Sequence, residues 1–225
     1  MISLYKIKPA YIHRENSLYF DDSNNSDEYQ YEVYQLAYTL SKTIPKLPVL
    51  DIGCGSGYKL VNIFKDFDTL CVELEETYKK LILKYPDKKW QIIKNTPPKG
   101  KFGIVILADV IEHLNNPDEM LEYLQKINFT YLIISTPDRD DLSLSQNGPP
   151  NNLAHAREWT FAEFHLYISE SFDIINHFIT NKQQRTQCIV CKRKETSTLK
   201  KILLFLKSFF KRKNKCKLTG KIEIV

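Results

Sequence analysis

Three stretches of this chain place glycines, acids or histidines at spacings that suit particular chemistry. In the first, the apolar run Val49–Ile52 carries Asp51 and leads into Gly53, Gly55 and Gly57. Because glycine tolerates positive φ, this stretch predicts a buried strand, a tight turn and a helix whose first N–H groups face a ligand. The spacing Asp-x-Gly-x-Gly-x-Gly differs from that of dinucleotide-binding loops and lacks the Lys-Ser/Thr of a phosphate-cradling loop.

An acid follows at the end of the next apolar run. Glu73 closes the run Thr69–Glu73 and lies 20 residues beyond Gly53. An acid at the end of a neighbouring strand can accept hydrogen bonds from the two hydroxyls of a ribose. The other interpretation, an acid that only begins the next helix, applies better to Glu75 and Glu76.

The second stretch is Asp109-Val110-Ile111-Glu112-His113. On a helical turn, positions i, i+3 and i+4 share one face, so its two carboxyls and its imidazole are expected to cluster. Carboxylates with an imidazole suit a divalent cation. Asp109, Glu112 and His113 are therefore candidate metal ligands, and Asp109 and His113 are candidate catalytic residues.

The third stretch is His155-Ala156-Arg157-Glu158-Trp159-Thr160. A loop histidine that titrates near neutral pH can take the proton of a hydroxyl, so His155 is a candidate catalytic base. Arg157 or Glu158 can orient it, and Trp159 offers an apolar face to a sugar ring. In the alternative interpretation, Thr160 only caps the next helix, with Glu163 completing a capping box.

The elements that must position these stretches alternate along the chain. The predicted strands are 49–52, 69–73, 90–94, 102–107 and 129–135, and the predicted helices are 29–44, 58–64, 75–85 and 117–127. This alternation implies an α/β fold with a parallel sheet. A helix at 161–169 then precedes strand-like runs at 172–180 and 186–192, which predict a terminal antiparallel hairpin. The irregular connection 136–158 leaves the carboxyl end of a strand and is expected to form the substrate wall.

The glycine stretch resembles motif I of the class I S-adenosylmethionine-dependent methyltransferases. This resemblance covers about Tyr29 to Lys192 and implies the Rossmann-like fold of that family. Its sheet is mostly parallel and seven-stranded, with a terminal antiparallel hairpin and helices on both faces. The implied cofactor is S-adenosylmethionine, with its ribose held by Glu73. The resemblance places six further residues at the cofactor, namely Asp51, Gly53, Cys54, Gly55, Ala108 and Asp109.

Two features depart from the family pattern. Phe102-Gly103 stands where many members have Phe-Asp, and Lys94-Asn95-Thr96 stands where an acid commonly contacts the adenine. The adenine contact therefore stays open. The Asn-Pro-Pro-Tyr and Pro-Cys motifs of DNA base methyltransferases are absent at the end of the fourth strand.

A metal is the second implied cofactor. Methyltransferases of quinone precursors and of small-RNA ribose 2′-hydroxyls have a similar acid-x-x-Glu-His stretch and bind a metal such as Mg²⁺ or Mn²⁺. By this likeness Asp109, Glu112 and His113 are ligands, and His155 is the fourth. Val-Ile-Glu-His-Leu also occurs in members with no known metal, where the equivalents of Glu112 and His113 only cap and support the site.

The acceptor is expected to be a hydroxyl of a sugar or glycan. Sequences similar to His155–Thr160 occur in methyltransferases that accompany glycosyltransferases, and the acidic, aromatic opening at 19–34 points the same way. The alternatives are a quinone-type phenol, an RNA ribose 2′-hydroxyl, or a non-catalytic cofactor-binding module in a glycan-assembly complex.

Charge divides the chain into two parts. Its net charge is +5, but nine basic residues and one acid from Leu199 onward give that part +8, so the remainder carries −3. We expect a methyltransferase domain at 1–195 and a basic amphipathic tail at 196–225. The tail suits peripheral contact with a membrane, or else a helix packed on the body. The acidic body argues against a nucleic-acid partner. Five cysteines without a disulfide framework, and no signal segment, predict a cytoplasmic protein.

Overall fold

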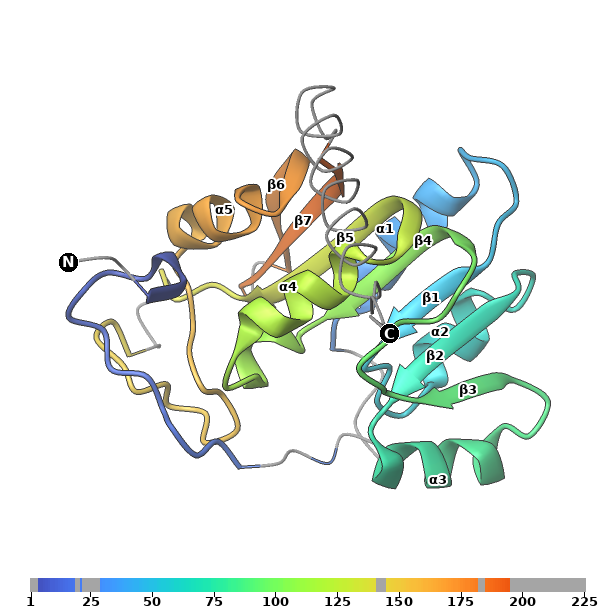
Figure 1. The fold of residues 1–225 in the computed structure, drawn as a ribbon, viewed down its shortest axis with the longest axis horizontal. Coiled ribbons are helices and arrows are strands. Elements are labelled where there is room, and N and C mark those ends of the chain that lie inside the picture. The colour runs from blue at the N-terminus through green and yellow to red at the C-terminus, as the bar shows by residue number, and fades with distance from the viewer. Residues whose placement is uncertain (1–3, 19–20, 22–28, 141–144, 182–184, 195–225) are drawn as a thin grey trace, which may run out of the picture. The chain divides into compact units, whose positions relative to one another are not determined.

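Strands of the described residues form one mixed sheet in the order β3-β2-β1-β4-β5-β7-β6 (Figure 1). The computed structural model describes residues 4–18, 21, 29–140, 145–181 and 185–194. The strands are β1 (Val49–Ile52), β2 (Thr69–Glu73), β3 (Lys89–Ile92), β4 (Lys101–Ala108), β5 (Asn128–Pro137), β6 (Phe172–Asn181) and β7 (Thr186–Arg193). β1 to β5 pair in parallel, whereas β7 is antiparallel to both β5 and β6. The predicted parallel sheet with a terminal antiparallel hairpin is confirmed.

Helices cover both faces of this sheet. They are α1 (Tyr31–Ser41), α2 (Tyr58–Ile63), α3 (Glu75–Lys84), α4 (Pro117–Gln125) and α5 (Phe161–Ser169), with 3-10 turns η1 (Leu4–Lys6) and η2 (Ile111–His113). α1 begins and ends inside the predicted range 29–44, and Gln30 before it has a φ of 60° that does not continue a helix. β3 begins one residue before the predicted strand and ends at Ile92.

Side chains alternate between the two faces of the sheet along each strand, so each face has its own hydrophobic core. Val49 and Ile104 pack on one face with residues of α1, α2 and α3, whereas Leu50 and Val105 pack on the other with residues of α4 and α5. Successive side chains of a strand point to opposite faces, so strands that are apolar throughout are covered on both sides. The helices on each face therefore follow directly from the apolar runs in the sequence.

The sheet order places a ligand crevice between β1 and β4. The chain runs outward from β1 through β2 to β3 and then returns to the other side of β1 with β4. In open α/β sheets, ligands bind outside the carboxyl ends of the strands at such a reversal. The glycine loop follows β1, and the stretch Asp109–His113 follows β4, so both lie at this point.

The cysteines correct one expectation. No disulfide framework was expected, but Cys54 and Cys71 are bonded to each other, with Cα atoms 6.4 Å apart. Because Asp51 of β1 pairs with Cys71 of β2, the turn after β1 lies close to β2. Cys188 and Cys191 are free and pack in opposite cores, as alternation along β7 predicts.

All described elements belong to the unit Met1–Arg193. The predicted basic tail at 196–225 lies outside the described residues, so its contact with a membrane stays a prediction. Within the described part of the chain, no helix combines the length and the apolar character needed to cross a membrane.

Candidate cofactor and acceptor site

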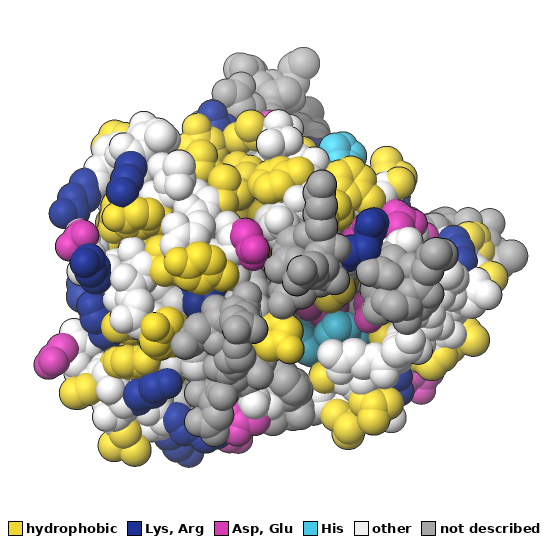
Figure 2. Space-filling view, turned by 180° about the vertical axis from the view of Figure 1, so that it is seen from behind, with side chains coloured by type: hydrophobic (Ala, Val, Ile, Leu, Met, Phe, Trp, Pro, Cys, Tyr) yellow, Lys and Arg dark blue, Asp and Glu magenta, His cyan; other side chains and the backbone are white. Residues whose placement is uncertain are grey.

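A cavity of about 330 Å³ opens at the carboxyl ends of β1, β2 and β4. Its polar lining includes Ser17, Gly53, Glu73, Asp109 and His113. Its apolar lining consists of Leu18, Ile52, Val72, Leu74, Ile93, Val110, Leu114 and Met120. Mostly apolar walls with a few convergent polar groups are typical of a site for a small organic cofactor. Histidine side chains are visible beside acidic and hydrophobic ones when the molecule is viewed from behind (Figure 2).

The glycine loop has the backbone that its sequence predicts. Gly53, Gly55 and Gly57 all have positive φ. A Cβ on Gly53 would lie 2.6 Å from Cγ2 of Val110, so glycine is required there for space as well as for conformation. Gly53 can therefore bring bare backbone against a ligand in the cavity.

Glu73 connects this loop to β2. Its Oε1 accepts the N–H of Gly55 at 2.8 Å, and its Oε2 accepts the N–H of Leu74 at 2.9 Å. The side chain is only 8% exposed and lines the cavity. A carboxylate oxygen can accept more than one hydrogen bond, so Glu73 can also receive the hydroxyls of a ribose.

The other predicted cofactor residues lie behind the cavity wall. Asp51 is buried, and its Oδ2 accepts the hydroxyl proton of Tyr34 at 2.8 Å. Cys54, Gly55 and Ala108 are not among the lining residues, and Ala108 is buried at the end of β4. Of the predicted cofactor residues, Gly53, Glu73 and Asp109 are thus the ones that reach the cavity.

The residues at the position where the sequence left the adenine contact open border two cavities. Ile93 lines the main cavity, and Lys94 and Asn95 line an adjoining cavity of about 400 Å³. The two cavities share Ile93, Leu114 and Met120. A flat ring among these apolar side chains would therefore have its edge near Asn95.

Asp109 closes the cavity on the β4 side. It has a φ of 50°, and its Oδ1 accepts the hydroxyl proton of Ser135 at 2.5 Å. Burial raises the pKa of the Asp109 carboxyl above its usual value, although the Ser135 hydrogen bond opposes this. The positive φ turns the chain sharply away from β4 and into η2.

Glu112 lies fully buried in η2. Its Oε2 accepts the hydroxyl proton of Thr136 at 3.0 Å, whereas its Oε1 has no hydrogen-bond partner among the described residues. Burial, together with the nearby charge of Asp109, raises the pKa of Glu112 to about 8. Its carbonyl accepts the N–H of Ala156 at 2.8 Å, which ties η2 to the third predicted stretch.

His113 is the histidine that lines the cavity. Its Nδ1 lies 2.9 Å from the carbonyl oxygen of Ala154. A carbonyl only accepts hydrogen bonds, so Nδ1 carries the proton of the neutral ring and Nε2 carries the lone pair. The side chain is 29% exposed, which leaves the ring accessible from the cavity.

His155 lies behind His113, with its ring edge-on and the ring centroids 4.8 Å apart. Its Nδ1 is 2.8 Å from Oε1 of the buried Glu158, and its Nε2 is 3.0 Å from the side-chain amide nitrogen of Asn152. Both ring nitrogens therefore contact the protein, and His155 does not line the cavity. Of the two orienting residues considered from the sequence, Glu158 is the one that contacts His155.

Three of the four predicted metal ligands come together. Donor atoms of Glu112, His113 and His155 all lie within 4.8 Å of one another. Asp109 is not part of this group. Two imidazoles and a carboxylate are a donor set that suits Mn²⁺ or another transition metal better than Mg²⁺.

Arg157 and Trp159 are positioned for structural roles. Arg157 is 2% exposed and donates from Nη1 to the carbonyl of Leu114 and from Nη2 to that of Asn115. Trp159 is fully buried and stacks on Tyr167, with centroids 5.5 Å apart. The suggestion that Trp159 presents its face to a sugar ring is wrong, because no part of that face is accessible.

The predicted capping box is present. Thr160 Oγ1 accepts the N–H of Glu163 at 3.2 Å, and Glu163 Oε2 accepts the N–H of Thr160 at 2.9 Å. This fixes the start of α5 and, with it, the end of the connection that carries His155.

Sequence reasoning missed the contribution of residues 4–18, here named the N-terminal strap. Ser17 and Leu18 of the strap line the cavity, and Ser17 Oγ donates to the carbonyl of His113 at 3.2 Å. Leu18 N–H donates to the carbonyl of Leu153 at 3.0 Å. These partners lie about 100 residues or more apart in the sequence, and no local pattern indicates such pairing.

The comparisons with known proteins agree with this geometry. A family model described as a methyltransferase domain matches residues 26–191. A search of curated proteins returned no match. Solved structures share the fold, among them an S-adenosylmethionine-dependent methyltransferase from Aquifex aeolicus, with 18% identity and a TM-score of 0.57 over 77% of this chain and 98% of that one.

Two further similar structures contain S-adenosylhomocysteine, the demethylated product of this cofactor. Magnesium protoporphyrin IX methyltransferase of Synechocystis PCC 6803 is 16% identical, with a TM-score of 0.54 over 73% of this chain and 84% of that one. The 1,6-didemethyltoxoflavin-N1-methyltransferase of Burkholderia thailandensis is 16% identical, with a TM-score of 0.53 over 72% and 79%.

The family match includes the glycine loop, Glu73 and the cavity residues from Ile52 to Met120, and it ends within β7. Gly53 and Glu73 are among the matched residues that line the cavity. This chain is therefore a member of the class I methyltransferase family, an enzyme that uses S-adenosylmethionine as its methyl donor.

Proposed function

We propose that the enzyme methylates a hydroxyl oxygen of a sugar or glycan acceptor and that His113 takes the hydroxyl proton. One observation carries the proposal: His113 lines the cofactor cavity with its Nδ1 2.9 Å from the carbonyl oxygen of Ala154, a contact that assigns the proton of the neutral ring to Nδ1 and the lone pair to Nε2. S-adenosylmethionine supplies a methyl group that its sulfonium already activates. The protein has to hold the acceptor oxygen in line, exclude water and remove one proton.

The residues around His113 suit this role. The carbonyl of Ala154 would lie against a protonated ring at Nδ1, and the buried carboxyl of Glu112 approaches Nε2 to 4.0 Å. The carbonyl oxygen of Ala154 accepts the Nδ1–H hydrogen bond and so stabilises the positive charge that the ring gains, whereas Glu112, whose pKa is raised to about 8, adds negative charge only in its ionised form.

His155 has a supporting part in this proposal, in contrast to the role expected for it from the sequence. Its two ring nitrogens contact Glu158 and Asn152, and its ring packs edge-on against His113. A proton acceptor must reach the acceptor hydroxyl, and of the two histidines only His113 lines the cavity. His155 therefore fixes the plane of the His113 ring.

Support for a sugar acceptor comes from the likeness of His155–Thr160 to methyltransferases that accompany glycosyltransferases. Ser17, Asp109 and His113 are the polar side chains on the β4 and strap sides of the cavity, and hydroxyl-rich molecules bind through such groups. A quinone-type phenol or a ribose 2′-hydroxyl remains the rival acceptor, because each also presents a hydroxyl to the same base.

The experiment is methyl transfer from ¹³C-methyl-labelled S-adenosylmethionine to a panel of methyl glycosides, nucleotide sugars, a catechol and a short RNA. Wild-type enzyme is expected to give an O-methyl product with a sugar. His113→Gln should lower kcat by about 10²-fold or more while S-adenosylhomocysteine still binds. His155→Gln should have a smaller effect. Full activity of His113→Gln, or a larger loss in His155→Gln, would overturn the assignment of the base.

A metal-assisted form of the reaction is the second candidate. It is favoured by the buried Oε1 of Glu112, which lacks a hydrogen-bond partner in the described part of the chain and lies in one group with donors of His113 and His155. These three residues would hold the ion, which would polarise an acceptor hydroxyl. To bind it, His155 would have to release either Asn152 or Glu158.

Elemental analysis of the purified protein, and Mn²⁺ binding followed by electron paramagnetic resonance, test this candidate. Stoichiometric Mn²⁺ binding that Glu112→Gln abolishes would support it. Full turnover in EDTA by a protein without bound metal would eliminate it. The proposal that His113 is the base in O-methylation is tested separately, by the identity of the product.

A further inference from the structure

The N-terminal strap crosses the connection that carries His155, although more than 130 residues separate them in sequence. Ile12 N–H donates to the carbonyl of Asn147 at 2.8 Å, and Arg14 N–H donates to that of Ala156 at 2.8 Å. A Cβ on Gly148 would lie 2.1 Å from the carbonyl oxygen of Ile12. The strap therefore packs against this connection at backbone distance.

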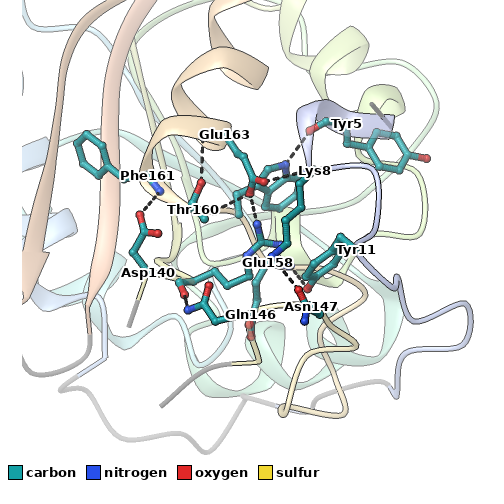
Figure 3. Close-up of polar contacts among 12 residues, drawn as sticks. Tyr5, Lys8, Tyr11, Asp140, Gln146, Asn147, Glu158, Thr160, Phe161 and Glu163 are labelled. Carbon is teal, nitrogen blue, oxygen red and sulfur yellow. Dashed lines mark hydrogen bonds and ion pairs between the residues drawn. The ribbon is translucent and has the colours of Figure 1, made fainter. Parts of the chain in front are cut away.

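Tyr11 is a buried residue of the strap that contacts this connection. It is 6% exposed, and its hydroxyl oxygen accepts the backbone N–H of Glu158 at 3.1 Å (Figure 3). Glu158 in turn accepts from Nδ1 of His155 through Oε1. The phenol of Tyr11 is thus two hydrogen bonds away from the imidazole of His155.

A buried charge network holds Tyr11 in place. The guanidinium of Arg139, which is fully buried, lies 4.3 Å from the centroid of the Tyr11 ring. Its Nη2 donates to Oε2 of Glu163, whose Oε1 accepts the backbone N–H of Lys8 at 2.9 Å. Arg139 therefore holds the strap at Tyr11, and Glu163 holds it at Lys8 (Figure 3).

Arg14 contacts the backbone of His155 directly. Its Nη2 donates to the carbonyl of Pro150 at 2.5 Å, and its Nε donates to the carbonyl of His155 at 3.3 Å. The backbone of His155 is held by Arg14, and its ring is held by Glu158, which Tyr11 positions. If the strap only covered the apolar core, the ring of Tyr11 would be enough, and neither its hydroxyl nor Arg14 would be needed.

We propose that Tyr11 and Arg14 of the N-terminal strap are positioning residues for methyl transfer: they lock the Glu158–His155 pair against His113. This inference rests on the proposed function. The strap completes the acceptor side of the site, and the base is held in its working orientation only while the strap is docked.

The test uses the full chain and the proton resonance of the His155 Nδ1–H, assigned by its loss in His155→Gln. In the wild-type protein the Glu158 hydrogen bond should protect this proton from exchange and shift it downfield. Tyr11→Phe keeps the ring and removes the hydroxyl, so it should broaden or abolish the signal. With any acceptor that the wild type methylates, the same variant should lower kcat by about tenfold, since small misplacements of a reacting group cost this much or more.

Tyr167→Phe is the matched control. The ring of Tyr167 is also buried, and its hydroxyl donates to Oδ1 of Asp118 at 2.6 Å, but it does not contact His155 or Glu158. This variant should keep the His155 signal and the wild-type kcat, even if it lowers the melting temperature.

If Tyr11→Phe does not fold, Arg14→Gln provides the second variant and should shift the same resonance. An unchanged His155 signal and unchanged kcat in folded Tyr11→Phe and Arg14→Gln would overturn the inference. Loss of the signal in both, in an enzyme that methylates no hydroxyl, would leave the strap's role intact and refute the proposed function instead.

Discussion

Replacing Glu73 by Gln tests the cofactor site most sharply. The change keeps the size of the side chain and removes its negative charge. In the folded chain, Glu73 accepts the N–H groups of Gly55 and Leu74 and also lines the cavity. The substitution therefore acts on cofactor binding and on the glycine loop together.

The size of each effect follows from these contacts. Hydrogen bonds to a charged acceptor contribute about 1–1.5 kcal/mol more than those to a neutral one. With two ribose hydroxyls on Glu73, the loss is about 2–3 kcal/mol, a weakening of the affinity by about 30- to 150-fold. A glutamine has a single acceptor oxygen, so one buried N–H loses its partner, at about 1–3 kcal/mol of stability.

Calorimetric titration with S-adenosylhomocysteine measures the first effect, and thermal unfolding measures the second. Glu75→Gln is the control, since Glu75 is largely exposed and pairs with Lys79 at 2.7 Å away from the cavity. We expect Glu75→Gln to bind as the wild type does. An affinity for Glu73→Gln within about twofold of the wild type, far below the difference expected for charged hydrogen bonds, would refute the ribose role.

Two further predictions concern the backbone and the pH. Gly53→Ala should destabilise the fold by about 1–3 kcal/mol and abolish binding of S-adenosylhomocysteine, because its φ is +81° and the new Cβ meets Val110 at 2.6 Å. Gly100→Ala has a φ of +124° but no atom within 4 Å, so in thermal unfolding it should show the cost of backbone strain alone and keep cofactor binding. Burial lowers the pKa of His177 from 6.5 to about 4, although its hydrogen bond to Gln187 opposes this. The unfolded chain then binds more protons than the folded one between these values, so stability is present above pH 6.5 and is lost as the pH falls toward 4. The difference is at most about 3 kcal/mol, and the partial exposure of the ring reduces it to about 1–2 kcal/mol. In His177→Phe the melting temperature should depend less on pH over this range. A decrease toward low pH as steep as that of the wild type would contradict the assignment.

Most of the fold could be predicted because its signals are local. The mostly apolar runs at 49–52 and 102–107 are typical of strands buried on both faces, and both observed strands cover these runs. Helix ends were less certain. α1 is shorter than its apolar periodicity suggests, since Gln30 has a left-handed conformation that the pattern does not indicate.

The candidate site was predictable only where its residues follow a strand directly. Gly53, Glu73 and Asp109 each lie at or just beyond the end of a strand, so the parallel order of the sheet brings them together. The roles of the two histidines depended on partners elsewhere in the chain. His155 belongs to a loop whose neighbours come from the strap and from η2, and Trp159 is buried by Tyr167 of α5.

The strap shows why such contacts escape sequence reasoning. Its hydrogen bonds join residues such as Tyr11 and Glu158, 147 positions apart. Neither hydrophobic periodicity nor a motif encodes a pairing of two irregular segments, because these hydrogen bonds use backbone groups that nearly every residue type carries.

We propose that this methyltransferase acts on a hydroxyl oxygen with His113 as the base. The most direct test of this proposal is the position of the ¹³C-methyl label in the product formed from labelled S-adenosylmethionine and the sugar panel. We expect an O-methyl signal on a sugar that His113→Gln loses while S-adenosylhomocysteine still binds. A label found on nitrogen or carbon, or cofactor binding without transfer to any hydroxyl in the panel, would contradict it.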